Sequence, residues 1–210
     1  MKHFIHIAAG LLAAVLSASA QNAAGILDKA ASVCSQPGGI SASFVMQTRS
    51  EQASESFEGV INIKGEKFTL STPGIKTWYD GTTQWTYMEH TEEVNITTPE
   101  EDELQFTNPG ILLATYQKGF TAVYKGEGTA TNGKAAYLIE LTPKKRTDIA
   151  KVELQIEKFS SLPVRIFVQM KNNLSNTIQI SEIKTNVNRE DSFFSFPKAD
   201  YPEAEVIDLR

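Results

Sequence analysis

Residues 76–87 read KTWYDGTTQWTY and place two short runs, rich in aromatic residues, on either side of Asp80-Gly81. An Asp-Gly pair between two such runs is the strongest short-range indication of a β-hairpin, because both residues tolerate the backbone angles of a tight turn. Trp85 and Tyr87 alternate with polar neighbours, so they share one side of the second strand. This hairpin is the centre of a region whose apolar residues repeat with a period of two.

The same period extends in both directions from the hairpin. On the N-terminal side, three runs carry apolar residues at every second position, ended by Pro73-Gly74: Ile40, Ala42, Phe44 and Met46; Phe57, Ile61 and Ile63; Phe68 and Leu70. Val94 and Ile96 mark a further strand beyond the hairpin. Five more strands are predicted, separated by turn residues, over 120–125, 135–141, 151–157, 163–170 and 177–185. The sequence therefore predicts about eleven strands.

Helical spacing is confined to two places. Residues 22–34 carry apolar side chains three and four positions apart, which predicts one amphipathic helix. The acidic run 100–103 is typical of the first turn of a short helix. Asn108-Pro109 matches an N-cap followed by proline at the first helical position, and predicts a second short helix over 110–116.

These elements predict a mainly β (α+β) protein with one domain. Short antiparallel strands at this spacing favour a single, strongly curved antiparallel sheet that forms an incomplete barrel. The N-terminal helix and the short helical insertion are expected to cover its concave face. The insertion would then act as a lid.

The first 20 residues are expected to be a cleaved secretory signal peptide. They contain a basic start at Met1-Lys2-His3, the apolar run 4–16 and the cleavage pattern Ala18-Ser19-Ala20. The mature domain would be residues 21–210, with 19 basic and 25 acidic side chains and a net charge of −6. That acidity gives no support for binding to nucleic acid, which requires a basic face.

Catalytic and metal-binding residues are scarce. His90 is the only histidine after residue 20, and it lies in an acidic turn, so we interpret it as a solvated turn residue. Cys34, the single cysteine, lies on the apolar side of the first helix and is interpreted as a buried, unreactive thiol. The sequence predicts no enzyme activity, no metal and no cofactor.

The aromatic and aliphatic content is the remaining signal. Most of these side chains must form a packed core. An alternative is that the concave face stays partly unfilled and takes an apolar ligand beneath a removable lid.

Several segments, in this order, resemble the periplasmic outer-membrane lipoprotein carrier family (LolA-like) across essentially the whole mature chain. They are Ala42-Ser43-Phe44, residues 64–68, Asp80-Gly81-x-Thr83-x-Trp85-x-Tyr87, Asn108-Pro109-x-Ile111-Leu112-Leu113-Ala114, Leu141-Thr142-Pro143-Lys144 and Phe194-x-Phe196-Pro197. The resemblance implies an unclosed antiparallel barrel with an apolar concave face covered by helices. It also implies a soluble, exported monomer in the periplasm of a Gram-negative bacterium.

The resemblance further implies a function and partners. The carrier receives acylated lipoproteins from an inner-membrane ABC transporter and passes them to the outer membrane, through an acceptor if one is present. A carrier of the same fold for another lipid or an apolar pigment, or a lipid-sensing interaction module, remains an alternative.

Alternation and resemblance together nominate site residues. The candidates for lining the acyl-chain cavity are Phe44, Met46, Ile61, Ile63, Phe68, Leu70, Trp85 and Tyr87. The candidates for the lid are Ile111, Leu112, Leu113 and Tyr116. The family often has an arginine after the lysine of the second strand, where it bonds to the lid, but here Gly65 follows Lys64. Arg49 and Lys67 are the candidates to replace that latch.

Overall fold

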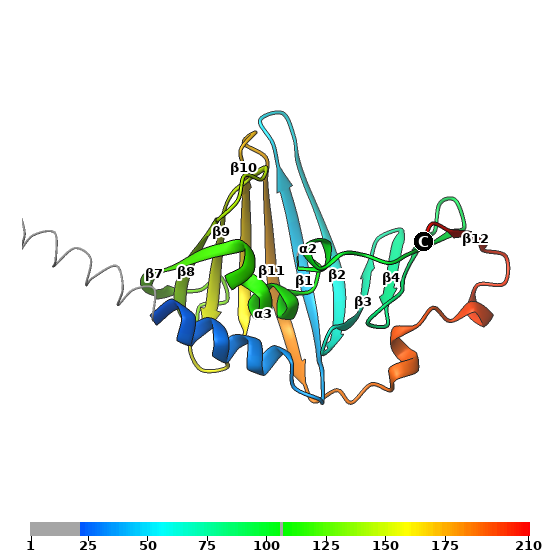
Figure 1. The fold of residues 1–210 in the computed structure, drawn as a ribbon, viewed down its shortest axis with the longest axis horizontal. Coiled ribbons are helices and arrows are strands. Elements are labelled where there is room, and N and C mark those ends of the chain that lie inside the picture. The colour runs from blue at the N-terminus through cyan, green and yellow to red at the C-terminus, as the bar shows by residue number, and fades with distance from the viewer. Residues whose placement is uncertain (1–21, 106) are drawn as a thin grey trace, which may run out of the picture.

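The computed structural model describes residues 22–105 and 107–210 (Figure 1). The expected signal peptide, residues 1–20, lies outside the described residues. Within the described part, 12 strands form one sheet in the order β12-β6-β5-β4-β3-β2-β1-β11-β10-β9-β8-β7. Their bounds are β1 Ile40–Arg49, β2 Ser54–Lys64, β3 Lys67–Thr72, β4 Ile75–Tyr79, β5 Gln84–Met88, β6 Glu93–Thr97, β7 Phe120–Thr129, β8 Ala135–Pro143, β9 Ile149–Glu157, β10 Pro163–Met170, β11 Ser175–Thr185 and β12 Glu205–Asp208.

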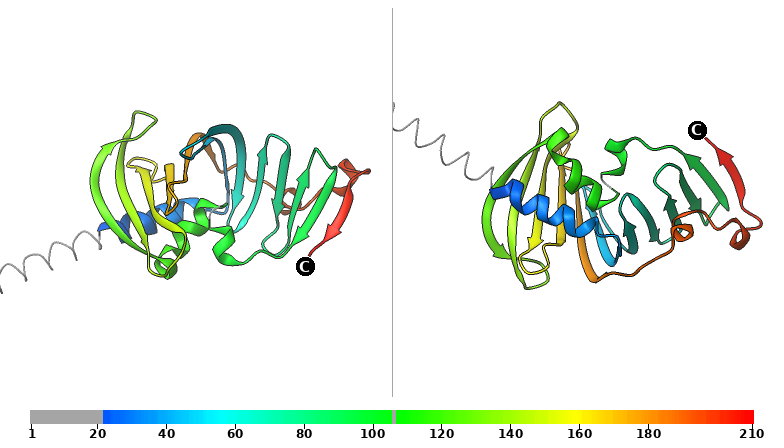
Figure 2. Two further views of the ribbon diagram at one scale, coloured as in Figure 1. Left: turned by 90° about the horizontal axis from the view of Figure 1, so that it is seen from above. Right: turned by 60° about the horizontal axis from the view of Figure 1, so that its bottom comes forward.

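The predicted fold class is confirmed. All neighbouring strands pair antiparallel except β12, which runs parallel to β6 at the edge of the sheet. The sheet curves strongly without closing (Figure 2). The sequence prediction of about eleven strands omitted β12, because its four residues are too few to show a period of two.

The helices lie on the concave side of this sheet (Figure 2). The N-terminal helix spans residues 22–34, and its apolar stripe of Ala23, Leu27, Ala30 and Cys34 is buried against the strands. The insertion between β6 and β7 contains α2 (Glu101–Leu104) and α3 (Pro109–Gly119). The N-terminal helix and α3 meet where Cys34 lies close to Gly110.

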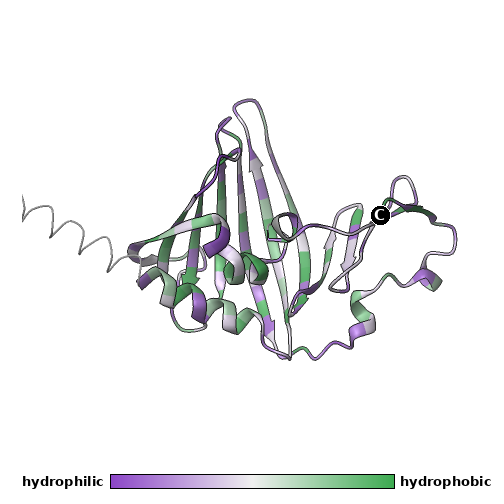
Figure 3. Ribbon diagram, viewed as in Figure 1, coloured by the Kyte–Doolittle hydropathy of each residue, from purple (hydrophilic) through white to green (hydrophobic). Residues whose placement is uncertain are grey.

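Strand register decides which side chains face the helices. Phe44 pairs with Gly59 on β2 and with Ile180 on β11, so these three positions share the concave face. A Cβ atom at Gly59 would come within 2.4 Å of the Phe44 ring, so only glycine allows the ring to lie across β2. Many residues of the central strands and of β7–β10 are hydrophobic, whereas the loop of the β1–β2 hairpin is hydrophilic (Figure 3).

The apolar face changes sides toward the β4–β6 end of the sheet. Trp78 pairs with Trp85, and Lys76 pairs with Tyr87, so all four lie on the convex face. Residues 186–210 form what we call the C-terminal strap, which crosses this face before ending in β12. Its Tyr201 ring lies 4.5 Å from the Tyr87 ring, between centroids. Apolar burial therefore continues on the convex face, under the strap.

One acidic residue fastens the start of the strap. Asp191 accepts a hydrogen bond from Lys64 Nζ at 2.8 Å and another from Lys67 Nζ at 2.7 Å. Those two bonds lower the pKa of Asp191 from 3.8 to about 2. A carboxylate whose pKa is lower in the folded than in the unfolded state stabilises the fold at any pH above its unfolded-state pKa. This stabilisation is lost as the pH falls through the folded-state pKa.

We therefore expect the strap to loosen between about pH 4 and pH 2. Hydrogen exchange at residues 189–196, after correction for the intrinsic rate, which itself slows over that range, should accelerate in the wild type as the pH falls. In Asp191→Asn it should already be faster at neutral pH and should change less on acidification. Equal pH profiles for the two proteins would show that Asp191 does not hold the strap.

Candidate functional site

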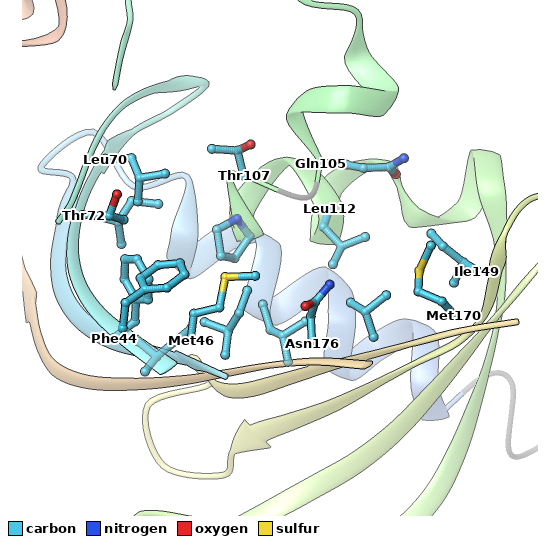
Figure 4. A pocket seen from close by; sticks show the side chains of 17 residues that line it. Phe44, Met46, Leu70, Thr72, Gln105, Thr107, Leu112, Ile149, Met170 and Asn176 are labelled. Atoms are coloured by element: carbon cyan, nitrogen blue, oxygen red, sulfur yellow. The ribbon is translucent and has the colours of Figure 1, made fainter. Parts of the chain in front are cut away.

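An apolar cavity of about 480 Å³ lies between the concave face and the lid (Figure 4). It lies on the side of α3 toward the β1–β2 and β10–β11 hairpins, and Phe57, 37% exposed, forms part of its rim. Its lining is mostly aliphatic and aromatic: Phe44, Met46, Phe57, Ile61, Leu70, Thr72, Gln105, Thr107, Pro109, Leu112, Ile149, Ile166, Val168, Met170, Asn176, Ile178 and Ile180. The size is that of a small-molecule site.

The floor of the cavity is a continuous apolar surface across five strands. Met46 on β1 pairs with Ile178 on β11, which in turn pairs with Ile166 on β10. On the other side of β1, Ile61 of β2 pairs with Leu70 of β3. Since paired residues in antiparallel strands project to the same side, the register alone assembles this floor.

One polar group interrupts the floor. Asn176 lies among the aliphatic side chains, but its Oδ1 accepts a hydrogen bond from Thr48 Oγ1 at 2.8 Å. Its polar demand is thus partly met by the neighbouring strand.

The lid inserts one of its predicted side chains into the cavity. Leu112 of α3 points into it from above the floor (Figure 4). Ile111 packs with the core around Phe68, and Leu113 and Tyr116 pack with the core beneath the N-terminal helix. The lid is therefore fixed by three side chains and closes the cavity with the fourth.

The structure brings together only some of the nominated lining residues. Phe44, Met46, Ile61 and Leu70 line the cavity. Ile63 and Phe68 are buried on the same face, in the adjoining core around Tyr79. Trp85 and Tyr87 lie on the opposite, convex face, because the cross-strand partner of Trp85 is Trp78, whereas Tyr79 faces the core. Neither of them contributes to the cavity wall.

Most of the wall comes from residues that were not among the candidates from sequence. β9, β10 and β11 contribute Ile149, Ile166, Val168, Met170, Ile178 and Ile180. The alternation of apolar residues within 163–170 and 177–185 predicted β10 and β11. The pairing of β11 with β1 places Ile180 and Ile178 opposite Phe44 and Met46. It joins segments more than 120 residues apart in the sequence.

The family profile described as outer membrane lipoprotein carrier protein LolA matches residues 13–172, more than half of the chain. This chain belongs to the LolA family. No protein among the curated sequences matches. The predicted membership is thus confirmed.

Solved structures are similar to this LolA family member at low identity. An uncharacterized conserved protein from Thermus thermophilus has a TM-score of 0.62 at 18% identity, covering 88% of this chain and 97% of that one. A DUF1329 family protein from Desulfovibrio piger has a TM-score of 0.50 at 13% identity, covering 84% and 97%. A LolA superfamily protein from Nitrosomonas europaea has a TM-score of 0.49 at 15% identity, covering 83% and 97%.

The lid of this LolA family member is held by groups other than the nominated Arg49 and Lys67. Arg49 is exposed at the end of β1, and Lys67 bonds to Asp191 of the strap. In the described part of the chain, neither side chain bonds to α3. The latch lies instead at Asn108, a fully buried residue directly before α3.

Asn108 joins the lid to the β2–β3 turn. Its Oδ1 accepts a hydrogen bond from the N–H of Gly110 at 2.9 Å, which caps α3. Its Nδ2 donates to the carbonyl oxygen of Glu66 at 3.3 Å, with Gly65 O at 3.5 Å. The position at which the family often has an arginine therefore still contacts the lid, but through its backbone carbonyl.

The other end of α3 is also fastened. Lys144 Nζ donates to the carbonyl oxygen of Gln117, and the Lys144 N–H donates to Gly119 O at 2.8 Å. A cation at a helix C-terminus is favourable because it meets unpaired carbonyl groups and the negative end of the helix dipole. Both ends of the lid helix are thus held by polar contacts to the sheet or its turns.

Two substitutions at Asn108 separate capping from latching. Asn108→Asp keeps the capping oxygen but removes the amide donor, so we expect faster opening of α3 with the helix retained. Asn108→Ala removes both functions and should also lower stability by about 1–2 kcal/mol. Hydrogen exchange of residues 109–119 measures both effects. Wild-type exchange in Asn108→Asp would contradict the latch.

The groups with chemical reactivity lie outside the cavity wall. Cys34 is 3% exposed, and burial raises the pKa of its thiol to about 12. His90 is exposed in the β5–β6 turn. Across residues 22–105 and 107–210, no three histidine, cysteine, aspartate or glutamate side chains come together to hold a metal ion. In the same residues, no helix is long and apolar enough to cross a membrane.

Proposed function

We propose that this LolA family protein is a periplasmic carrier of lipoproteins, which binds their acyl chains in the apolar cavity without catalysis. It would receive them from the inner-membrane ABC transporter and deliver them to the outer membrane. The observation that carries the proposal is the apolar cavity of about 480 Å³ beneath the helical lid α3. Membership in a family of lipoprotein carriers supports it.

The energetics of acyl chains agree with a cavity of this kind. Each methylene group removed from water gains about 0.8 kcal/mol, so about ten buried groups gain roughly 8 kcal/mol. That free energy corresponds to a dissociation constant of about 1 μM before the costs of ordering are subtracted. Such binding shields the chain in transit and still allows its release.

The lid provides a way to tune that affinity. Leu112 occupies part of the cavity that a chain would use, so the empty, closed state competes with the ligand. A ligand shifts such an equilibrium only by its preference for one of the two states. The polar contacts of Asn108 and Lys144 therefore set how much binding energy is spent on opening the lid.

The identity of the cargo is tested by native mass spectrometry. The mature chain is purified from its own periplasm without detergent, and bound molecules are released by activation. An acylated lipoprotein supports the proposal. A phospholipid or a pigment indicates a same-fold carrier of another amphiphile. A bare chain that also fails to bind an added acylated lipoprotein contradicts the proposal.

A further inference from the structure

A second, more polar cleft continues from one end of the apolar cavity. Its volume is about 630 Å³, and Gln105 and Ile149 line both spaces. These two residues lie at the same end of the cavity (Figure 4). The cleft follows α3 past Thr115 to Lys118 and Gly119, and its opposite side is formed by Pro143, Lys145 and Thr147. The two spaces together form one groove, which is more polar at the end lined by Lys118 and Lys145.

Charged side chains of both signs line this cleft. Lys118 on α3 and Lys145 in the β8–β9 loop line the cleft, together with the carboxylate of Glu100. Arg146, the next residue in the loop, is exposed, and in the described part of the chain Lys145 and Arg146 make no ion pair. Thr147 Oγ1 accepts a hydrogen bond from the N–H of Ile149 at 2.9 Å, a local bond where the loop enters β9.

We propose that this cleft binds the anionic polar end of an amphiphile whose acyl chain occupies the apolar cavity. Lys145 provides the charge-assisted contact to a phosphate or carboxylate. The inference rests on the proposed function and specifies its ligand class. A lysine that is unpaired within the described residues, in a cleft contiguous with an acyl site, favours ligands that are both acylated and negatively charged near the chain.

The test compares two probes with the same acyl chain, below their micelle concentrations. Lysophosphatidic acid carries a phosphate, and the matching monoacylglycerol carries none. Each probe displaces a fluorescent fatty acid from the delipidated mature chain. We expect the wild type to prefer the phosphate probe by about fivefold, and added salt to reduce that preference, because the contact is partly exposed.

Variants assign the preference to the cleft. Lys145→Glu should abolish or invert it and leave monoacylglycerol binding unchanged, whereas Lys198→Glu, the same charge change on the strap, should preserve it. Inorganic phosphate should not compete, since the acyl chain provides the anchor. Equal affinity of both probes for the wild type, or an unchanged ratio in Lys145→Glu, overturns the inference while the proposed function stands. Failure of both probes to bind overturns the proposed function as well.

Discussion

Replacing Met46 with aspartate is expected to abolish most acyl-chain binding. Met46 lies on the floor of the apolar cavity, at the register position facing Ile178. A hydrated carboxylate there would exclude about three methylene groups of the ligand. At about 0.8 kcal/mol each, the loss is about 2.4 kcal/mol, or roughly fiftyfold in affinity. Displacement of a fluorescent fatty acid measures it.

The neighbouring residue gives a matched control. Val45 is 36% exposed on the other side of the same strand, so Val45→Asp introduces the same charge outside the cavity. We expect wild-type binding from it. Ile178→Trp, which fills the cavity without adding charge, should also weaken binding, with circular dichroism showing that each variant is folded. Equal losses in Val45→Asp and Met46→Asp would contradict the assigned site.

The largest loss of stability is expected from Phe194→Ala in the C-terminal strap. Phe194 is 1% exposed, and its ring lies 5.5 Å from that of Phe193, between centroids. Truncating a buried phenylalanine costs about 3–5 kcal/mol. For a chain of this size, the melting temperature should fall by about 10 °C. Thermal unfolding followed by circular dichroism measures the change.

Phe159→Ala is the control for this prediction. Phe159 is 96% exposed in the β9–β10 turn, so the same truncation there should leave the melting temperature unchanged. If Phe194→Ala melted within about 2 °C of the wild type, the strap would not be part of the folded core. The convex-face packing of Trp78, Phe196 and Tyr201 would then need another explanation.

Most of the secondary structure could be predicted from local sequence patterns. The alternation in β1, β2 and β3 and the Asp80-Gly81 turn define strands by their own residues, so these elements were predictable. The N-terminal helix and the Asn108 cap were equally local, and the structure contains both. β12 was not predictable, because a four-residue parallel edge strand is defined by the β6 edge that it meets.

The site was only partly predictable, since strand alternation gives relative sides within one strand. From sequence, Phe44 and Trp85 were both predicted to line the cavity. The sheet, however, buries apolar residues on its concave face at β1 and on its convex face at β5. The change of face depends on the strap, whose course across β4–β6 is a tertiary property. For the same reason, the wall from β9, β10 and β11 required knowledge of the β1–β11 pairing.

Only one of the two roles of Asn108 could be predicted from sequence. Asn108 was readable from sequence as a helix cap, because capping is a local function. Its second role, donating to the carbonyls of the β2–β3 turn, depends on a contact across 42 residues.

The central claim, that the apolar cavity holds the acyl chains of a lipoprotein, is tested most directly by site-specific photo-cross-linking. A photoreactive residue is placed at Ile178, on the cavity floor, or at Gln179, exposed on the opposite face of β11. Each protein is mixed with a purified acylated lipoprotein or with its deacylated form. The account predicts an adduct only from position 178 and only with the acylated lipoprotein. Equal adducts from both positions, or from the deacylated protein, would contradict it.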